Sequence, residues 1–285
     1  MRDVFLPKNT EELWAILEKE PTAAIYAGGT DLLVKLRSGL LDARSLICLE
    51  RMEAFQGVRE SGEEIFIGAA TTHSRLIADR LVRQYFPVLV KGATVLGSPP
   101  IRHMGTIGGN IVTASPAGDT LPALYVLEAE VEIRSATYYR RVPLTEFIKG
   151  PGEVDLQQGE ALAGVWLKKT SEWTVSHYEK VGRRKAQACS VAGMAALLNL
   201  SNSGKIEAAR LAWGSVGPTV IRSTTIEHAL IGESLTSDTL NRVAHLVREA
   251  VSPIDDVRAT AAYRRAVAGA LLLRLSAYGN RGNQE

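Results

Sequence analysis

The chain has 285 residues, 46% of them hydrophobic, and 33 basic against 31 acidic side chains give a formal net charge of +2. This length predicts two domains or three small ones, with ample apolar material for their cores. The balanced charge, without a basic stripe interleaved with aromatic residues, argues against a nucleic-acid binder.

The two cysteines, Cys48 and Cys189, lie in apolar stretches and are expected to be free thiols. Their number excludes a disulfide framework, a cysteine-ligated metal and an iron–sulfur cluster held by this chain alone. The N-terminus lacks the apolar core of a signal peptide, and the apolar run 266–273 is too short to span a bilayer. A cytoplasmic protein without a membrane span is therefore expected.

The first 55 residues predict a compact unit of two short strands and two helices. Asn9 or Thr10 can cap the first helix, and Gly28-Gly29 ends the first strand. The predicted elements are helix 11–20, strand 23–27, helix 30–37 and strand 45–49.

Residues 56–170 predict a second mixed unit. Its segment 97–110 is expected to be irregular, because it holds two prolines and four glycines. The other predicted elements are strand 64–68, helices from 74 and over 85–96, helix 119–127, a hairpin of 131–135 with 139–143, and strand 162–167.

The pattern of predicted strands and helices changes near residue 170. A meander of strands followed by helices predicts a separate α+β domain over 171–285. The predicted elements are strands 174–181, 191–200 and 208–215, then helices 225–231, 237–251 and 259–277.

Common catalytic and nucleotide-binding motifs are absent, including the P-loop and the G-x-G-x-x-G fingerprint. The five histidines show no metal-ligand spacing. We therefore expect no metal site and no catalytic acid–base pair in this chain.

Two glycine-rich loops remain as candidates. In residues 27–31 (AGGTD) a strand stops at adjacent glycines and a helix begins, which would present unpaired backbone N–H groups to an anion. Residues 105–110 (GTIGGN) offer bare backbone, a hydroxyl and an amide in the same way. Neither loop contains a lysine or arginine, so a bound anion would rely on backbone dipoles. Each loop alone is typical of a tight turn, whereas the pair favours a diphosphate site without naming the ligand.

A family resemblance identifies that ligand. Residues 101–123 (IRHMGTIGGNIVTASPAGDTLPA) resemble the long signature of the FAD-binding subunit of molybdenum hydroxylases, as in xanthine dehydrogenase and aerobic carbon monoxide dehydrogenase. Residues 27–33 (AGGTDLL) resemble its first FAD loop, and 178–185 and 256–265 resemble segments of its C-terminal domain. The pair His103-Met104 departs from the commoner Asn-Val of relatives and could tune flavin exposure.

The resemblance implies a fold and a set of cofactor contacts. The fold would be α+β: a two-subdomain, PCMH-like FAD-binding domain (1–55 and 56–170), then a C-terminal domain (171–285) of a three-stranded antiparallel sheet and a helical bundle. The first loop would wrap the diphosphate and ribityl chain, and the second would close the other side. Ser115 and Asp119 would contact the adenosine half, Leu162 would lie beside the isoalloxazine, and Lys180 near its pyrimidine edge. The implied FAD-binding residues are Ala27, Gly28, Gly29, Thr30, Asp31, Leu32, Leu33, Val34, Thr106, Ile107, Gly108, Gly109, Asn110, Ser115, Asp119, Leu162 and Lys180.

The resemblance also implies partners. A large subunit with a molybdopterin cofactor would act on the substrate, and a small subunit with two [2Fe–2S] clusters would pass electrons to FAD. Reduced flavin would then deliver them to NAD or another acceptor. Two rivals remain: a stand-alone FAD-dependent oxidase or dehydrogenase, and a non-catalytic assembly protein.

Overall fold

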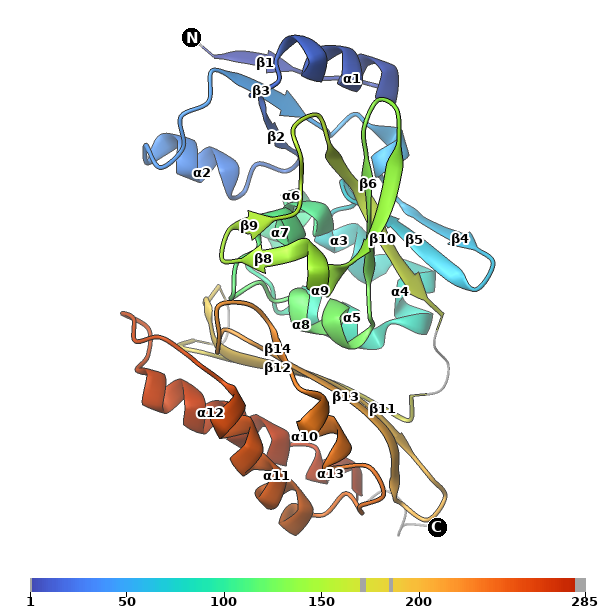
Figure 1. Ribbon diagram of the computed structural model, residues 1–285, viewed down its shortest axis with the longest axis vertical. Helices are drawn as coiled ribbons and strands as arrows, with labels where there is room; N and C mark the ends of the chain where they lie inside the picture. The colour runs from blue at the N-terminus through green and yellow to red at the C-terminus, as the bar shows by residue number, and fades with distance from the viewer. Residues whose placement is uncertain (1, 170–172, 185–186, 280–285) are drawn as a thin grey trace. The chain divides into compact units, whose positions relative to one another are not determined.

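The computed structural model describes residues 2–169, 173–184 and 187–279 of the chain (Figure 1). They form a mixed α+β structure of two compact units. Unit 1 comprises residues 1–84, 98–114 and 128–169, and unit 2 comprises 85–97, 115–127 and 170–285. Two short segments from the first half of the chain thus belong to unit 2. The predicted boundary at 170–171 lies outside the described residues.

Unit 1 holds two sheets, a small hairpin and short helices. Its strands are β1 (Asp3–Phe5), β2 (Ala24–Tyr26), β3 (Ser45–Cys48), β4 (Val58–Ser61), β5 (Glu64–Gly68), β6 (Glu130–Arg134), β7 (Tyr139–Pro143), β8 (Ile148–Gly150), β9 (Glu153–Val154) and β10 (Ala161–Lys168). Its helices are α1 (Thr10–Lys19), α2 (Leu32–Arg37), η1 (Glu53–Phe55), α3 (His73–Ala78), α4 (Arg80–Tyr85), α6 (Pro99–Met104), α7 (Ile107–Thr113) and α9 (Leu144–Phe147).

The first sheet is parallel, in the order β1-β3-β2. Helix α1 begins as predicted, because the side chain of Asn9 accepts a hydrogen bond from the N–H of Glu12 at 2.9 Å. Its buried Leu13 and Leu17 pack in one cluster with Ile47 of β3. This packing holds β3, which pairs with β2, the strand that leads into the first glycine loop.

The second sheet is antiparallel, in the order β4-β5-β10-β6-β7, and its β6–β7 pair confirms the predicted hairpin. Alternation along β5 places Ile65 and Ile67 in the core, both fully buried. Beyond β5, residues 69–73 run antiparallel to residues 105–108: the N–H of His73 donates to the carbonyl oxygen of Gly105, and that of Ile107 to the carbonyl oxygen of Thr71, both at 3.0 Å. We call residues 69–73 the strap.

The expectation that 97–110 is irregular was wrong. Helix α6 begins with Pro99 at its first position, where the missing N–H of proline costs no hydrogen bond. Position 108 of helix α7 requires glycine, because a Cβ there would lie 2.5 Å from the Cβ of Ala69 in the strap. Tertiary packing therefore supports helices that the local glycine and proline content disfavours.

Unit 2 is built on a four-stranded antiparallel sheet in the order β11-β12-β13-β14. The three predicted strands are present, and a two-residue fourth strand extends the sheet. The strands are β11 (Val175–Gly182), β12 (Ser190–Leu200), β13 (Ile206–Gly214) and β14 (Ile221–Arg222). The helices are α5 (Pro87–Thr94), α8 (Leu121–Val126), α10 (Thr224–His228), α11 (Ser237–Ala250), α12 (Ala261–Leu273) and α13 (Ser276–Gly279).

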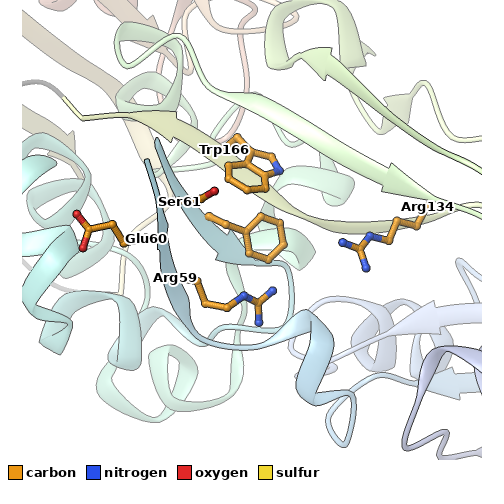
Figure 2. A pocket seen from close by; sticks show the side chains of 6 residues that line it. Arg59, Glu60, Ser61, Arg134 and Trp166 are labelled. Carbon is orange, nitrogen blue, oxygen red and sulfur yellow. The ribbon is translucent and has the colours of Figure 1, made fainter. Parts of the chain in front are cut away.

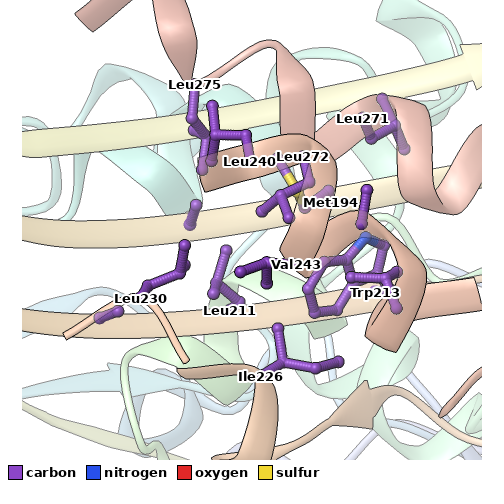
Figure 3. Packing of buried hydrophobic residues seen from close by; sticks show 14 of the residues in the cluster. Met194, Leu211, Trp213, Ile226, Leu230, Leu240, Val243, Leu271, Leu272 and Leu275 are labelled. Atoms are coloured by element: carbon purple, nitrogen blue, oxygen red, sulfur yellow. The ribbon is translucent and has the colours of Figure 1, made fainter. Parts of the chain in front are cut away.

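The core of unit 2 lies between this sheet and the C-terminal helices (Figure 3). Met194 and Trp213 of the sheet pack in one cluster with Val243 of α11 and Leu272 of α12. The indole N–H of Trp213 donates to the carbonyl oxygen of Ala268 at 3.1 Å, so the buried donor is satisfied. Helices α5 and α8 contact β11, β12 and β13 as well.

None of the helices within the described residues has the length and apolar character needed to cross a membrane.

Candidate functional site

The first glycine loop joins β2 to α2 and requires glycine at two positions. A Cβ on Gly28 would lie 1.6 Å from the carbonyl oxygen of Met104, so only glycine allows this close approach. Gly29 has φ +67°, in the left-handed region that glycine adopts without strain. The loop is thus shaped both by its own dihedral angles and by the end of α6.

The backbone of this loop is available to an anion. Among the described residues, no acceptor receives the N–H groups of Gly28, Gly29, Thr30 or Asp31. Free N–H groups beside glycines, next to a helix start, form a cradle for phosphate oxygens. The sequence predicts such unpaired N–H groups in this loop, and their contact with a diphosphate stays a prediction.

The second glycine loop differs from the expectation that its backbone is also free. The N–H of Ile107 donates to Thr71 and that of Gly108 to Ala69, at 3.0 and 2.9 Å. The N–H of Gly109 donates to the hydroxyl of Thr106 at 3.1 Å, and that of Asn110 to the carbonyl oxygen of Thr106 at 3.0 Å. These four donors are used inside the fold, so the loop buttresses the site more than it cradles an anion.

The structure brings the two loops together within unit 1. Besides the approach of Gly28 to Met104, a Cβ on Gly105 would lie 3.3 Å from the hydroxyl oxygen of Thr30. The hydroxyl of Thr113, at the end of α7, donates to the carboxylate of Asp31 at 3.2 Å. Loops separated by some 75 residues in the sequence therefore form one surface.

The remaining residue predicted in unit 1, Leu162, lies at the start of β10. It is 5% exposed and precedes a register shift between Leu162 and Gly164 in the pairing with β6. Leu32, Leu33 and Val34 belong to α2, which buries none of its residues. Val34 is 61% exposed. An apolar helix surface next to the first loop is thus left uncovered by the described residues of this chain.

Three predicted residues belong to unit 2. Ser115 follows Ala114, whose left-handed φ of 45° ends α7, and its hydroxyl accepts from the N–H of Ala117 at 3.3 Å. Asp119 and Lys180 form a buried ion pair, with 2.6 Å between a carboxylate oxygen and Nζ and side chains 8% and 9% exposed. Lys180 also donates to the carbonyl oxygen of Val95 at 3.2 Å.

The carboxylate of Asp119 is left partly unsatisfied. Its Oδ2 meets Lys180, whereas its buried Oδ1 has no hydrogen-bond partner among the described residues. Burial raises the pKa of Asp119 to about 6, and the ammonium of Lys180 opposes this rise. A buried carboxylate oxygen without a partner is costly in the protein alone and would be satisfied by a donor on a ligand.

Sequence reasoning missed four residues that the structure adds around these groups. His73 lies where the two loops meet. Gly193 pairs with Lys180 across the sheet, and the hydroxyls of Tyr178 and Ser190 border Gly193. Tyr178 belongs to the recognised segment 178–185, which was a usable signal, although Lys185 lies outside the described residues. The others depend on cross-strand register, which a single sequence does not reveal.

A separate pocket of about 300 Å³ opens on the antiparallel sheet of unit 1 (Figure 2). Its lining includes Arg59, Arg134 and Trp166. The indole N–H of Trp166 donates to Glu132 at 2.7 Å, and the guanidinium of Arg141 lies 3.7 Å from the centre of the Trp166 ring. None of the predicted FAD-binding residues lines this pocket. Arg134 also donates to Glu132, and Arg59 donates to backbone carbonyl oxygens, so these polar groups have partners within the fold.

No cluster of three or more metal-ligating side chains occurs within the described part of the chain. Cys48 is buried and Cys189 exposed, and both are free thiols.

Comparisons with known proteins match both parts of the chain. Residues 1–167 match the family model of the FAD binding domain in molybdopterin dehydrogenase, and 176–277 match the CO dehydrogenase flavoprotein C-terminal domain. The chain belongs to the FAD-binding subunits of the molybdenum hydroxylases.

Individual relatives of this FAD-binding subunit agree. It is 31% identical to the xanthine dehydrogenase FAD-binding subunit of Escherichia coli O157:H7, over 87% of this chain and 86% of the relative. It is 29% identical to the nicotinate dehydrogenase FAD-subunit of Eubacterium barkeri, over 92% and 90%. A carbon monoxide dehydrogenase structure from Hydrogenophaga pseudoflava superposes with a TM-score of 0.90 at 28% identity, covering 96% of this chain and 95% of that chain.

The cofactor of this subunit family is FAD. The residues present fit it in two ways: the first loop offers free N–H groups beside glycines, and Oδ1 of Asp119 is a buried acceptor without a donor. The chain is therefore an oxidoreductase subunit that binds FAD.

Proposed function

We propose that this chain is the electron-transfer subunit of a multi-subunit molybdenum hydroxylase. It would receive electrons from the [2Fe–2S] clusters of a small partner subunit, while a molybdopterin-containing large subunit acts on the substrate. NAD or another acceptor would take the electrons onward. The observation that carries this proposal is the first glycine loop, whose four free N–H groups face no acceptor within the described chain.

The proposed contacts follow the sequence-based assignment with one revision. Residues 27–34 hold the diphosphate and ribityl chain, residues 106–110 support them, and Ser115 contacts the adenosine half. Leu162 and Lys180 lie at the ring. Asp119 and Lys180 are in direct contact, so both are expected to meet the same end of the cofactor. We therefore assign Asp119 to the ring end instead of the adenosine half.

The bound isoalloxazine would supply the redox chemistry, which is why this chain needs no acid–base pair of its own. The chain's residues bind and orient the cofactor. The ammonium of Lys180 is held by Asp119 and Val95 in a buried position, where a fixed cation favours nearby negative charge more strongly than it would in water.

The two rivals make different predictions on purification. A stand-alone oxidase or dehydrogenase would carry FAD and turn over its substrate without partners. An assembly protein without cofactor would be colourless. The family matches over residues 1–167 and 176–277 support the subunit instead.

The proposal is tested by the flavin content of the purified chain. We expect stoichiometric FAD with absorbance near about 450 nm. Thr30→Val removes a hydroxyl donor from the first loop while preserving shape, and we expect FAD binding to weaken about three- to tenfold. Thr94→Val, in which the lost hydroxyl bonds only the carbonyl oxygen of Val90 in α5, is the matched control.

A colourless wild-type protein that also fails to take up added FAD would contradict the proposal. Equal FAD affinities for Thr30→Val, Thr94→Val and wild type would remove the first loop from the site.

A further inference from the structure

One cross-strand row on the sheet of unit 2 is nearly bare of side chains. Lys180 of β11 pairs with Gly193 of β12, which in turn pairs with Gly214 of β13. Directly paired residues project from the same face of a sheet. Pro122 of α8 covers Gly214, since a Cβ there would lie 2.9 Å from its Cγ. Gly193 is different, because a Cβ there would meet only ordinary contacts of 3.5 Å or more.

Two hydroxyl groups border the space at Gly193. The hydroxyl oxygens of Ser190 and Tyr178 each lie 3.5 Å from the position of a Cβ on Gly193. Ser190 is 4% exposed, and its Oγ has no hydrogen-bond partner in the described chain. Burial raises the pKa of Tyr178 well above its usual value, so its hydroxyl keeps its proton and can donate.

The unpartnered Oδ1 of Asp119 belongs to the same neighbourhood. A Cβ on Gly92 of α5 would lie 3.0 Å from the backbone oxygen of Asp119 and 3.2 Å from the Tyr178 ring. The charge of Asp119 also acts on the Tyr178 hydroxyl. Two buried polar atoms without partners, on Asp119 and Ser190, therefore flank one bare stretch of sheet. A buried polar atom without a partner is destabilising unless a ligand satisfies it.

The hydrogen-bonding groups around this space indicate which part of a ligand they would bind. Asp119 supplies an acceptor, whereas Ser190, Tyr178 and Lys180 supply donors. A planar heterocycle with a ring N–H between two carbonyl oxygens complements this arrangement, and glycine lets its ring approach the backbone. The pyrimidine edge of the isoalloxazine has this pattern.

We infer that Ser190 and Tyr178 are further flavin-binding residues, whose hydroxyls donate to the ring carbonyl oxygens above Gly193 while Oδ1 of Asp119 accepts from the ring N–H. This inference rests on the proposed function, because it needs FAD as the ligand. The donors also stabilise negative charge on the ring, so they raise the reduction potential of the bound flavin.

Gly193→Ala is the sharpest test. The added methyl group makes only ordinary contacts with the protein, and alanine suits a strand better than glycine, so the apoprotein should keep its unfolding temperature. The methyl group would occupy the space assigned to the ring, and we expect FAD affinity, measured by the fluorescence of released flavin, to fall at least about tenfold.

Ser190→Ala and Tyr178→Phe test the hydroxyls. We expect each to weaken FAD binding about three- to tenfold, to shift the visible absorption bands and to lower the midpoint potential of the bound flavin. Ser215→Ala is the matched control, because Ser215 is also buried with an unpartnered hydroxyl in unit 2 but does not border Gly193. It should leave both affinity and spectrum unchanged.

The outcomes separate this inference from the proposed function. If wild type binds FAD and Thr30→Val weakens binding, but Gly193→Ala and Ser190→Ala change neither affinity nor spectrum, the inference is overturned and the FAD site stands. If wild type takes up no FAD, both fail. A spectral shift in Ser190→Ala but not in Thr30→Val is the signature of contact with the ring.

Discussion

His73 is the first residue of α3 and lies, 2% exposed, where the strap meets the second glycine loop. A Cβ on Gly105 would lie 3.4 Å from its Cδ2 and 3.3 Å from the hydroxyl oxygen of Thr30. Burial, and then the charge of Arg102, lower the pKa of His73 to about 4. The imidazole is therefore neutral at physiological pH, and its packing helps to shape the junction of the two loops.

This shift predicts a pH dependence of stability. Between pH 6.5 and 4 the unfolded chain binds a proton at His73 that the folded chain does not, so stability is lost as pH falls through this window. In urea titrations of the apoprotein, we expect the difference in unfolding free energy between wild type and His73→Gln to change by about 3 kcal/mol from pH 6.5 to 4. The raised pKa of Asp119 acts in the opposite direction, but it is common to both proteins and cancels in the difference. Parallel pH profiles would refute the prediction.

At the scale of elements, the site of unit 1 depends on how closely the strap approaches α7. A Cβ on Gly108 would lie 2.5 Å from the Cβ of Ala69 and 2.7 Å from its carbonyl oxygen. The neighbouring Gly109 has more space, since its Cβ would lie 3.0 Å from the hydroxyl oxygen of Thr106 and meet no other nearby atom. The two adjacent glycines of one motif therefore have different physical roles.

Their alanine variants should separate these roles. Gly108→Ala forces α7 away from the strap, and we expect a loss of about 1–3 kcal/mol in unfolding free energy together with weakened FAD binding. Gly109→Ala gains up to about 1 kcal/mol of helix propensity, which offsets the close contact of the new methyl group with the hydroxyl oxygen of Thr106. We therefore expect nearly unchanged stability. Thermal unfolding of both apoproteins checks this pair, and equal destabilisation would show that the spacing at Gly108 is not the constraint.

At the scale of the whole molecule, the proposed role is that of one subunit in a complex whose partners carry the [2Fe–2S] clusters and the molybdenum. We expect the tagged chain, purified from its own cells, to carry flavin, molybdenum and about four iron atoms per flavin, as two [2Fe–2S] clusters require. Metal analysis of the purified complex measures this. A flavin-containing chain that lacks both metals and turns over a substrate by itself would support the stand-alone rival.

Features with a local signal could be predicted from the sequence. The cap at Asn9, the hairpin of β6 and β7, the three long strands of unit 2 and the helices α11 and α12 follow from capping residues, alternation and helical periodicity. The motif over residues 101–123 identified the family and its cofactor. Helices α6 and α7 were missed, because proline at a first helical position and glycine against the strap are acceptable only where the tertiary packing provides for them.

The sequence by itself determined the family, the cofactor and most long elements, because each is encoded in residues close together along the chain. Only the tertiary structure decided that the first glycine loop keeps its N–H groups free while the second uses four of them internally. It also decided that Asp119 meets Lys180 and that Gly193 lies in the same row as Lys180. Both facts depend on contacts and strand register between distant segments, which a single sequence leaves open.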